Sequence, residues 1–303
     1  MRVGVSLRSG YAPAEAPNAA QWMVERAKAA FDAGLDSLFV GDHHSTGPFP
    51  YMQNVAIMGR LLAEWHGRTA GILMLLPLWN PVLAAEQIGT LAAIHDGPFV
   101  LQCAVGGYEP QFKAMGAQLR ERASSFESSL DVIRRLLNGE SVSTAVPFEI
   151  DAARVAPICD NGIDIWIGGS AERAIDRAAR LGDVFLVGPE ATLAQAKVLL
   201  DVYRSRCAAH GKEPARVAIR RDIHCGPPEE VTRVAQPIID AGYRGFDTAA
   251  LVIGDSNSVA DNFAELGAVG FTDIIIRHLA NEHSAVLASF ARLADVRRSV
   301  SGL

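Results

Sequence analysis

The sequence predicts an α/β fold, a single (β/α)8 TIM barrel, from two observations. Short apolar runs rich in β-branched residues alternate along the chain with amphipathic segments of helical period. About eight such units can be counted, which is the number a barrel of this type requires, and 303 residues exceed the ~250 that it needs. An open doubly wound sheet is the alternative, but no GxGxxG motif follows the first strand. No low-complexity linker divides the chain, so residues 1–303 are predicted to form one domain.

The first half of the chain contains four strand-helix units. Gly34 ends the first helix, and Pro81 begins the third with a backbone angle already suited to a helix. The predicted strands are residues 2–7, 36–40, 70–76 and 99–105. The predicted helices are residues 18–33, 52–65, 81–94 and 123–137.

The second half repeats the pattern after a short interruption. Residues 141–157 combine alternating polarity with turn residues, which predicts a hairpin or loop insertion after the fourth strand-helix unit. Strands are then predicted at residues 164–168, 183–187, 217–224 and 272–277. An Ala-rich helix is predicted after each of the first two of these strands, and the earlier of these two helices spans residues 172–181. Further helices are predicted at residues 229–241, 256–266 and 282–293.

Composition excludes several classes of protein. A chain that is 49% hydrophobic and 20% charged is neither disordered nor a coiled coil. A net charge of −6 without a Lys/Arg cluster argues against nucleic-acid binding. The most apolar stretch, residues 71–79, is too short to span a bilayer, and the first residues lack the apolar run of a signal peptide. The four cysteines are scattered and have no metal-ligand spacing, so we expect no metal site and a reducing, cytoplasmic compartment. Together with the short apolar stretch, this predicts a soluble protein with no membrane partner.

In a barrel of this type, the chemistry belongs at the carboxyl ends of the strands. Asp42, His43 and His44 follow the second strand, and an imidazole beside a carboxylate is suited to acid–base chemistry near neutral pH. Adjacent residues at a strand end point in different directions, so at most one of the two histidines is predicted to be catalytic. The alternative is that this segment is merely a polar loop.

Two glycines and a small polar residue follow the fifth strand and open a helix. Gly168 and Gly169 allow close approach of the backbone to a ligand, and the N–H groups that follow Ser170 and Ala171 point toward an anion such as phosphate. Taken alone, the segment is better explained as an ordinary tight turn in which Ser170 caps the helix.

Polar and aromatic residues also lie at other strand ends. Alternation along the seventh strand directs Arg220, Asp222 and His224 toward the barrel interior, where an Arg–Asp ion pair is at least as reasonable as a ligand contact. Other candidates for ligand contact are Arg277 after the eighth strand, the aromatic residues Trp79 and Tyr108, and Arg122, which could also pair with a nearby glutamate.

Four motifs, taken in order, resemble the bacterial luciferase-like family of flavin- and deazaflavin (F420)-dependent oxidoreductases. They are Ala33-Gly34-Leu35-Asp36 continuing to Asp42-His43-His44, Leu76-Pro77-Leu78-Trp79-Asn80-Pro81 with Glu86-Gln87, Val105-Gly106-Gly107-Tyr108-Glu109 with Phe112 and Gly116, and Ile165-Trp166-Ile167-Gly168-Gly169-Ser170 with Ala178-Ala179-Arg180-Leu181-Gly182-Asp183. The resemblance spans almost the whole chain. It implies the same barrel fold that the strand count predicts.

The resemblance implies roles for individual residues. His43 matches the family histidine at the reactive edge of the cofactor, which is FMN or coenzyme F420. Gly168, Gly169, Ser170 and Ala171 match the turn that holds the cofactor phosphate. We also expect Ile72, Leu73, Gly106 and Arg122 to contact the cofactor, and Trp79, Tyr108, His224 and Arg277 to line a substrate pocket at the strand ends. A non-prolyl cis peptide in strand three, common in the family, would fall within residues 72–74.

Three departures separate this chain from bacterial luciferase. Ala104 occupies the position of its reactive cysteine in strand four, with Cys103 on the opposite face, and Val105 replaces the neighbouring arginine. The long lid-like insertion is also reduced, so light emission is not predicted.

The sequence therefore predicts an oxidoreductase, with monooxygenation of a small organic substrate slightly preferred. F420-dependent hydride transfer by a dehydrogenase or reductase is the first alternative. A metal-dependent hydrolase using Asp42, His43 and His224, or a non-catalytic flavin-binding protein, are alternatives of other classes. The resemblance also implies a homodimer and, for FMN, a partner reductase.

Overall fold

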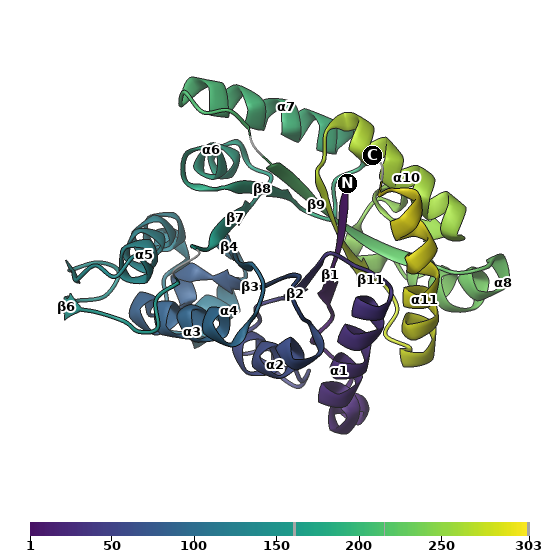
Figure 1. Cartoon of the computed structure of the whole chain (residues 1–303), viewed down its shortest axis with the longest axis horizontal. Coiled ribbons are helices and arrows are strands. Elements are labelled where there is room, and N and C mark those ends of the chain that lie inside the picture. Colours follow the sequence, from purple (N-terminus) through teal and green to yellow (C-terminus); the bar gives the residue numbers. More distant parts are fainter. Residues whose placement is uncertain (160–161, 215, 302–303) are drawn as a thin grey trace. The chain divides into compact units, whose positions relative to one another are not determined.

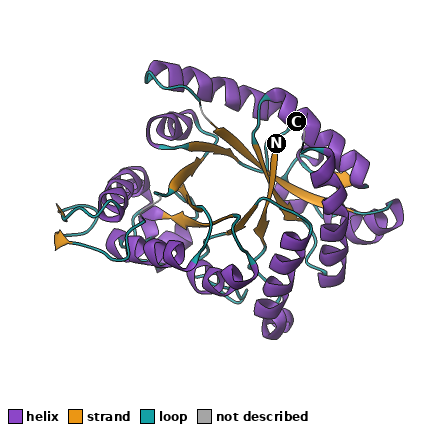
Figure 2. Ribbon diagram, viewed as in Figure 1, coloured by secondary structure: helices purple, strands orange, loops and turns teal. Residues whose placement is uncertain are grey.

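The computed structural model describes residues 1–159, 162–214 and 216–301. The chain separates into two compact units. Unit 1 contains Met1–Arg8, Asn18–Phe39 and Trp166–Leu303, and unit 2 contains Ser9–Pro17 and Val40–Ile165. Helices and parallel strands alternate within each of them (Figure 2).

The order of the strands in the sheet is that of a (β/α)8 barrel, as predicted. Strands β11, β1, β2, β3, β4, β7 and β8 are successive neighbours, and β9 pairs with both β11 and β8, which closes the order. Their bounds are β1 (Arg2–Leu7), β2 (Ser37–Val40), β3 (Thr69–Leu75), β4 (Phe99–Ala104), β7 (Asp164–Gly168), β8 (Val184–Val187), β9 (Arg216–Cys225) and β11 (Asp273–His278). A further short strand, β10 (Val252–Gly254), pairs with the end of β9.

In unit 1 the helices that accompany the strands bury mainly apolar side chains, which include the aromatic residues Tyr203, Phe263 and Phe290. Helices α6 and α7 pack together, as do α10 and α11 (Figure 1). The parallel pairing of β9 with β11 sets Asp222 opposite Arg277. The helix bounds are α1 (Ala16–Asp32), α6 (Glu172–Leu181), α7 (Leu193–Ala209), α10 (Ser256–Val269) and α11 (His283–Ser299).

In unit 2, β3 and β4 pair in regular register from Ala70↔Phe99 to Leu75↔Ala104, and α3 packs on α5. Strands β5 (Val142–Thr144) and β6 (Ile150–Ala153) form a separate antiparallel pair. The helices of this unit are α2 (Asn54–Leu61), α3 (Pro81–Ile94), α4 (Glu109–Ala114) and α5 (Arg122–Leu137). Helix α4 was not predicted, because its six residues are too few to show a helical period.

Two features of the backbone differ from the sequence-based expectation. The helix predicted at 229–241 is α8 (Pro228–Glu230), a π-helical turn (Val231–Ala235) and α9 (Gln236–Asp240), because Pro237 has no N–H group to continue a regular ladder. The cis peptide bonds among the described residues precede Pro147 and Pro157. Residues 72–74 hold none, and this stretch of β3 pairs regularly with β4.

No helix in the described ranges has both the length and the apolar character needed to cross a membrane. The interior of unit 1 is formed by large buried side chains. Phe39 packs on Trp166 with ring centroids 5.2 Å apart, and Phe185 stacks on Tyr203 at 4.8 Å.

One histidine is built into this interior. His278 at the end of β11 is buried, its Nε2 lies 2.9 Å from Ser289 Oγ, and its ring packs edge-on against Phe290 of α11. Burial lowers the pKa of His278 to about 3, and the neighbouring Arg26 adds to this effect. The native protein therefore holds this imidazole neutral.

We predict that acid weakens the fold through His278. Its native pKa of about 3 lies below the ~6.5 of an unfolded histidine, so the unfolded chain binds the proton more readily throughout that window. The free energy of unfolding should fall as pH drops below about 6.5. The variant His278→Gln should flatten that fall by up to about 1.4 kcal/mol per pH unit. Urea denaturation at several pH values measures the free energy of unfolding, and His66→Gln, which changes an exposed histidine, is the control. Equal slopes of this free energy against pH for the two variants would contradict the prediction.

Candidate active site

Asp42, two residues after the end of β2, is the centre of a buried polar network in unit 2. Its side chain is fully buried, and its Oδ2 accepts hydrogen bonds from the Leu75 backbone N–H at 2.8 Å and from Trp79 Nε1 at 2.9 Å. His44 Nε2 lies 2.9 Å from Asp42 Oδ1. That contact is short but is not aligned as a linear hydrogen bond. One carboxylate thus fixes the end of β3, the Trp79 indole and the His44 imidazole.

The two adjacent histidines have different surroundings. The His43 ring packs on Tyr51 with centroids 4.3 Å apart, and the His43 carbonyl accepts a hydrogen bond from Gln53 Nε2 at 3.0 Å. The His44 ring instead meets the edge of Trp79 at 5.3 Å, and its side chain is only 10% exposed. The sequence predicts His43 as the acid–base residue, whereas the structure adds His44 as the imidazole that lies against a buried carboxylate. The Asp42-x-His44 spacing was the available signal.

The position of Tyr51 is set by the chain on both sides of it. Gly10 pairs with Tyr51 in an isolated antiparallel bridge, flanked by hydrogen bonds from Tyr11 N to Pro50 O and from Met52 N to Ser9 O. A Cβ atom on Gly10 would lie 2.6 Å from the Tyr51 ring, so only glycine allows this approach. The support beneath His43 is therefore rigid.

The other predicted residues of unit 2 are spread over its strand ends and loops. Ile72 is fully buried, and the Leu73 carbonyl accepts a hydrogen bond from the buried Asn54 Nδ2 at 2.6 Å. Gly106 adopts a left-handed backbone (φ 69°) against Phe112. Arg122 begins α5 and donates to the Leu119 carbonyl at 2.9 Å, while Tyr108 is 66% exposed.

The predicted phosphate turn lies in unit 1, where β7 ends at Gly168 and α6 begins at Glu172. Ala171 occupies the N-cap position, and no side chain caps the helix there. By contrast, α7 is closed by a capping box between Thr192 and Gln195. The first N–H groups of α6 therefore lack a side-chain acceptor, which an anion can supply.

Gly169 brings this turn close to its helix. A Cβ atom on Gly169 would lie 2.5 Å from the Ala174 Cβ, closer than side chains tolerate. Glu172 would oppose an anion at this helix start, but its carboxylate is paired with Arg206. The turn is therefore compatible with a phosphate group on electrostatic grounds.

A cavity of about 500 Å³ lies beside the turn. Ser170 lines it on one side, and the first turns of α7 line it on the other. The remaining lining residues are Glu190, Ala191, Ala194, Gln195, Val198 and Leu199. The cavity places a predominantly apolar surface next to the anion-accepting helix start.

Arg220 and Asp222 of β9 form the ion pair that the sequence offers as an alternative to a ligand contact. Arg220 binds the fully buried Asp222 with both Nε and an Nη group, at 2.8 and 2.9 Å. Tyr243 donates its hydroxyl to Asp222 Oδ2 at 2.7 Å, and burial, together with that carboxylate, raises the pKa of Tyr243. Burial and the nearby Arg220 lower the pKa of Arg277 to about 10, so Arg277 remains charged at neutral pH.

His224 lies in different surroundings. It is buried, and its Nε2 is 3.3 Å from Glu230 Oε1 without the alignment of a hydrogen bond. Arg292 of α11 binds the same carboxylate with two hydrogen bonds, at 3.0 and 2.8 Å, and lowers the pKa of Glu230. Burial also lowers the pKa of His224. His224 thus lies near Glu230, which follows β9, and near Arg292 of α11. Arg277 instead lies near Arg220 and Asp222 of β9.

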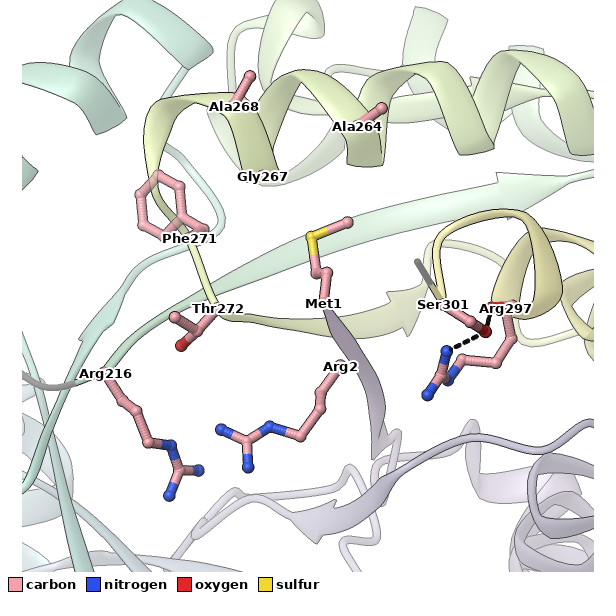
Figure 3. Close-up of a pocket in the computed structure, with 10 residues that line it drawn as sticks. All are labelled: Met1, Arg2, Arg216, Ala264, Gly267, Ala268, Phe271, Thr272, Arg297 and Ser301. Atoms are coloured by element: carbon pink, nitrogen blue, oxygen red, sulfur yellow. Dashed lines mark hydrogen bonds between the residues drawn. The ribbon is translucent and has the colours of Figure 1, made fainter. Parts of the chain in front are cut away.

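A larger cavity, of about 640 Å³, opens at the amino ends of β1, β9 and β11 (Figure 3). Arg2 and Arg216 line it and share the carboxylate of Asp273, at 2.9 and 3.6 Å. In (β/α)8 enzymes the chemistry lies at the opposite, carboxyl ends of the strands. We therefore assign the candidate site to the carboxyl ends, despite the greater volume here.

Over the described ranges, no three His, Cys, Asp or Glu side chains gather closely enough to hold a metal ion. Both Asp42 oxygens already face protein donors. The metal-dependent alternative gains no support from these residues.

The fold defines a (β/α)8-barrel protein with titratable residues after its second strand, and most of the chain is similar to proteins of one family. Residues 1–268 match the family described as luciferase-like monooxygenase. The chain belongs to this luciferase-like family of flavin- and deazaflavin-dependent oxidoreductases, as its motifs indicate.

Relatives and solved structures agree with this membership. An F420-dependent glucose-6-phosphate dehydrogenase of Mycobacterium avium (strain 104) is 28% identical over 199 residues, which cover 59% of this chain and 56% of that relative. An F420-dependent secondary alcohol dehydrogenase in complex with an F420-acetone adduct superimposes with a TM-score of 0.78 at 17% identity, covering 99% and 98% of the two chains. The oxygenating constituent of 3,6-diketocamphane monooxygenase from the CAM plasmid of Pseudomonas putida, in complex with FMN, gives 0.73 at 16% identity, covering 97% and 96%.

We predict that Asp42→Ala destabilises the protein by about 2–4 kcal/mol, because it leaves the buried donors of Leu75 and Trp79 without an acceptor. Asp42→Asn should cost less, since its amide oxygen still accepts one of these bonds. Urea unfolding at neutral pH measures both, with Asp32→Ala, an exposed partner of Lys28, as the surface control. A loss for Asp42→Ala no greater than for Asp32→Ala would refute the structural role of this carboxylate.

Proposed function

We propose that this chain is a redox enzyme that binds a phosphorylated flavin-type cofactor, F420 or FMN, with F420-dependent hydride transfer as its first candidate reaction. The observation that carries the proposal is the helix start at Gly168–Ala171. It lacks a side-chain cap, it is sterically close-packed at Gly169, and it belongs to the segment that matches the family. These residues fit a cofactor phosphate.

The chain's own residues would divide the work. The N–H groups that follow Ser170 and Ala171 bind the phosphate, and the apolar cavity beside them shelters the adjoining part of the cofactor. Ile72, Leu73, Gly106 and Arg122 are the proposed further cofactor contacts. Trp79, Tyr108, His224 and Arg277 remain proposed pocket residues for a small organic substrate.

His43 is the proposed acid–base residue. F420, when bound, supplies a carbon that accepts or donates a hydride. In an alcohol oxidation His43 would take the hydroxyl proton of the substrate, and in a reduction it would return one. Tyr51 fixes the His43 ring, and Asp42 holds the adjacent His44, so the imidazole that moves the proton starts from a fixed orientation.

F420 is preferred over FMN because the curated relative compared above is F420-dependent, although the match spans little more than half of its length. Monooxygenation with FMN is the second candidate. It is favoured by the description of the matching family and by the FMN-bound monooxygenase of similar fold. In that case a partner reductase would supply reduced flavin, and His43 would move a proton during oxygen transfer. We further propose that the protein is a cytoplasmic homodimer.

We predict that apo-protein binds F420 tightly, and more tightly than FMN, in paired fluorescence titrations. Gly169→Ala should weaken binding at least tenfold, because its Cβ would push the turn away from Ala174. Gly59→Ala in α2 is the matched control, since a Cβ there makes only an ordinary contact, 3.9 Å from Leu91. Tight binding of FMN alone would move the proposal to its second candidate. Binding of neither, or equal binding by both glycine variants, would contradict the assignment of the turn.

We predict that His43→Ala lowers turnover about 100-fold or more while leaving cofactor affinity nearly unchanged, as expected for loss of an acid–base group. Loss of F420 absorbance with a panel of alcohols and sugar phosphates measures the rate. His66→Ala, an exposed imidazole, is the control. If His43→Ala turns over normally and His44→Ala does not, then His44 is the acid–base residue.

A further inference from the structure

Three arginine side chains of unit 1 converge on one carboxylate. Arg220 pairs with both oxygens of Asp222, and Arg244 Nη1 lies 3.7 Å from Asp222 Oδ2. Arg277 lies opposite Asp222 in the parallel pairing of β11 with β9, so its side chain shares that face of the sheet. Asp222 is fully buried, whereas Arg220 is 18% and Arg244 47% exposed. Asp222 and Arg277 lie in the carboxyl-terminal halves of β9 and β11.

The charges of this group do not balance. Within unit 1, three guanidinium groups face a single carboxylate, which leaves an excess of two positive charges. Among the described residues, no acceptor forms a hydrogen bond or ion pair with the Arg277 side chain. The neighbouring Arg221 does not change this balance, because it donates to the Ala191 carbonyl and has Glu190 nearby as its own counter-charge.

Arg244 is held in this group at a cost in backbone energy. Its φ of 53° is left-handed, a conformation that costs a non-glycine residue about 1–2 kcal/mol. Gly242 and Gly245 on either side have positive φ as well, and the Arg244 guanidinium packs over the Phe246 ring at 5.1 Å. The short turn Tyr243–Gly245 thus directs both the Tyr243 hydroxyl and the Arg244 guanidinium toward Asp222.

Unpaired charge that is half removed from water is unfavourable unless a partner of opposite charge arrives. A planar guanidinium presents paired donors that match the two oxygens of a carboxylate or phosphate. We infer that Arg220, Arg244 and Arg277, with Tyr243, form a binding site for an oxyanion, a carboxylate or phosphate group. Asp222 orients Arg220 and Tyr243 and leaves Arg277 and one face of Arg244 for the ligand.

This site specifies a substrate class. If the proposed function holds, the oxyanion is a group of the substrate, so the enzyme acts on a small organic acid or a phosphate ester rather than on a neutral alcohol or ketone. The other source of the same chemistry is an anionic group of the cofactor. The oxyanion site itself does not depend on the proposed function, because it is inferred from the positions and charges of Arg220, Arg244, Arg277 and Asp222 and from no property of the cofactor.

Isothermal titration calorimetry with inorganic phosphate and with succinate, at constant ionic strength, tests the inference on the full-length apo-protein. Saturable binding is expected, and Arg277→Gln should weaken it at least about tenfold, as the loss of a charge-assisted hydrogen bond predicts. Arg244→Gly is the second variant, since glycine suits the left-handed backbone and the fold is kept while the charge is lost. Arg120→Gln, whose side chain is 79% exposed, removes a charge elsewhere and should change nothing.

The same titrations in the Gly169→Ala background exclude phosphate held at the turn after β7. Binding that persists with saturating cofactor and depends on Arg277 assigns the oxyanion to the substrate. Binding that the cofactor abolishes, with weaker cofactor affinity in Arg277→Gln, assigns it to the cofactor. Absence of saturable binding, or equal affinities in Arg277→Gln, Arg244→Gly and the parent protein, overturns the inference. Failure of the cofactor titrations alone would leave these phosphate results intact.

Discussion

The buried carboxylate of Asp42 is the constraint on which the acid–base region depends. Removing a charge from water is costly, so this carboxylate needs protein donors, and the Leu75 backbone N–H and the Trp79 indole supply them to one oxygen, while the His44 imidazole lies 2.9 Å from the other. Because the acceptor has no alternative in water, these groups are fixed relative to one another. The loop after β2, the end of β3 and the segment before α3 therefore form one rigid piece.

Unit 1 shows the opposite electrostatic arrangement. Its candidate binding features are positive or electron-poor: a helix start without a side-chain cap at α6, and three guanidinium groups around one carboxylate at the ends of β9 and β11. Each of these two features lacks a balancing negative charge, which an anionic ligand provides. The net charge of the whole protein is −6, so this local excess of positive charge is a property of the fold and not of the composition.

Much of the barrel could be predicted because each strand and helix carries its own periodic signal. Helix α6 and strand β7 have the predicted bounds, and α3 runs from Pro81 to Ile94 as expected. Short or irregular elements could not be predicted this way. Helix α4 has too few residues, the π-helical turn depends on how Pro237 is accommodated, and β10 exists only because β9 extends far enough to pair with it. Whether a cis peptide occurs within residues 72–74 could likewise be decided only from the backbone of the structure.

For the candidate site, the sequence by itself determined which polar and glycine residues follow each strand, because the order of strands and the residues after them are local properties. His43, the glycine turn and Arg277 are recognisable in this way. Only the tertiary structure decided which groups meet. It placed Asp42 against His44 and Trp79, set His224 beside Glu230 and Arg292, and gathered Arg244 from a distant turn onto Asp222. The contacts of Trp79 with Asp42 and of Arg292 with Glu230 join residues far apart in the chain. The energies of all these contacts depend on burial and distance, which no periodicity or motif encodes.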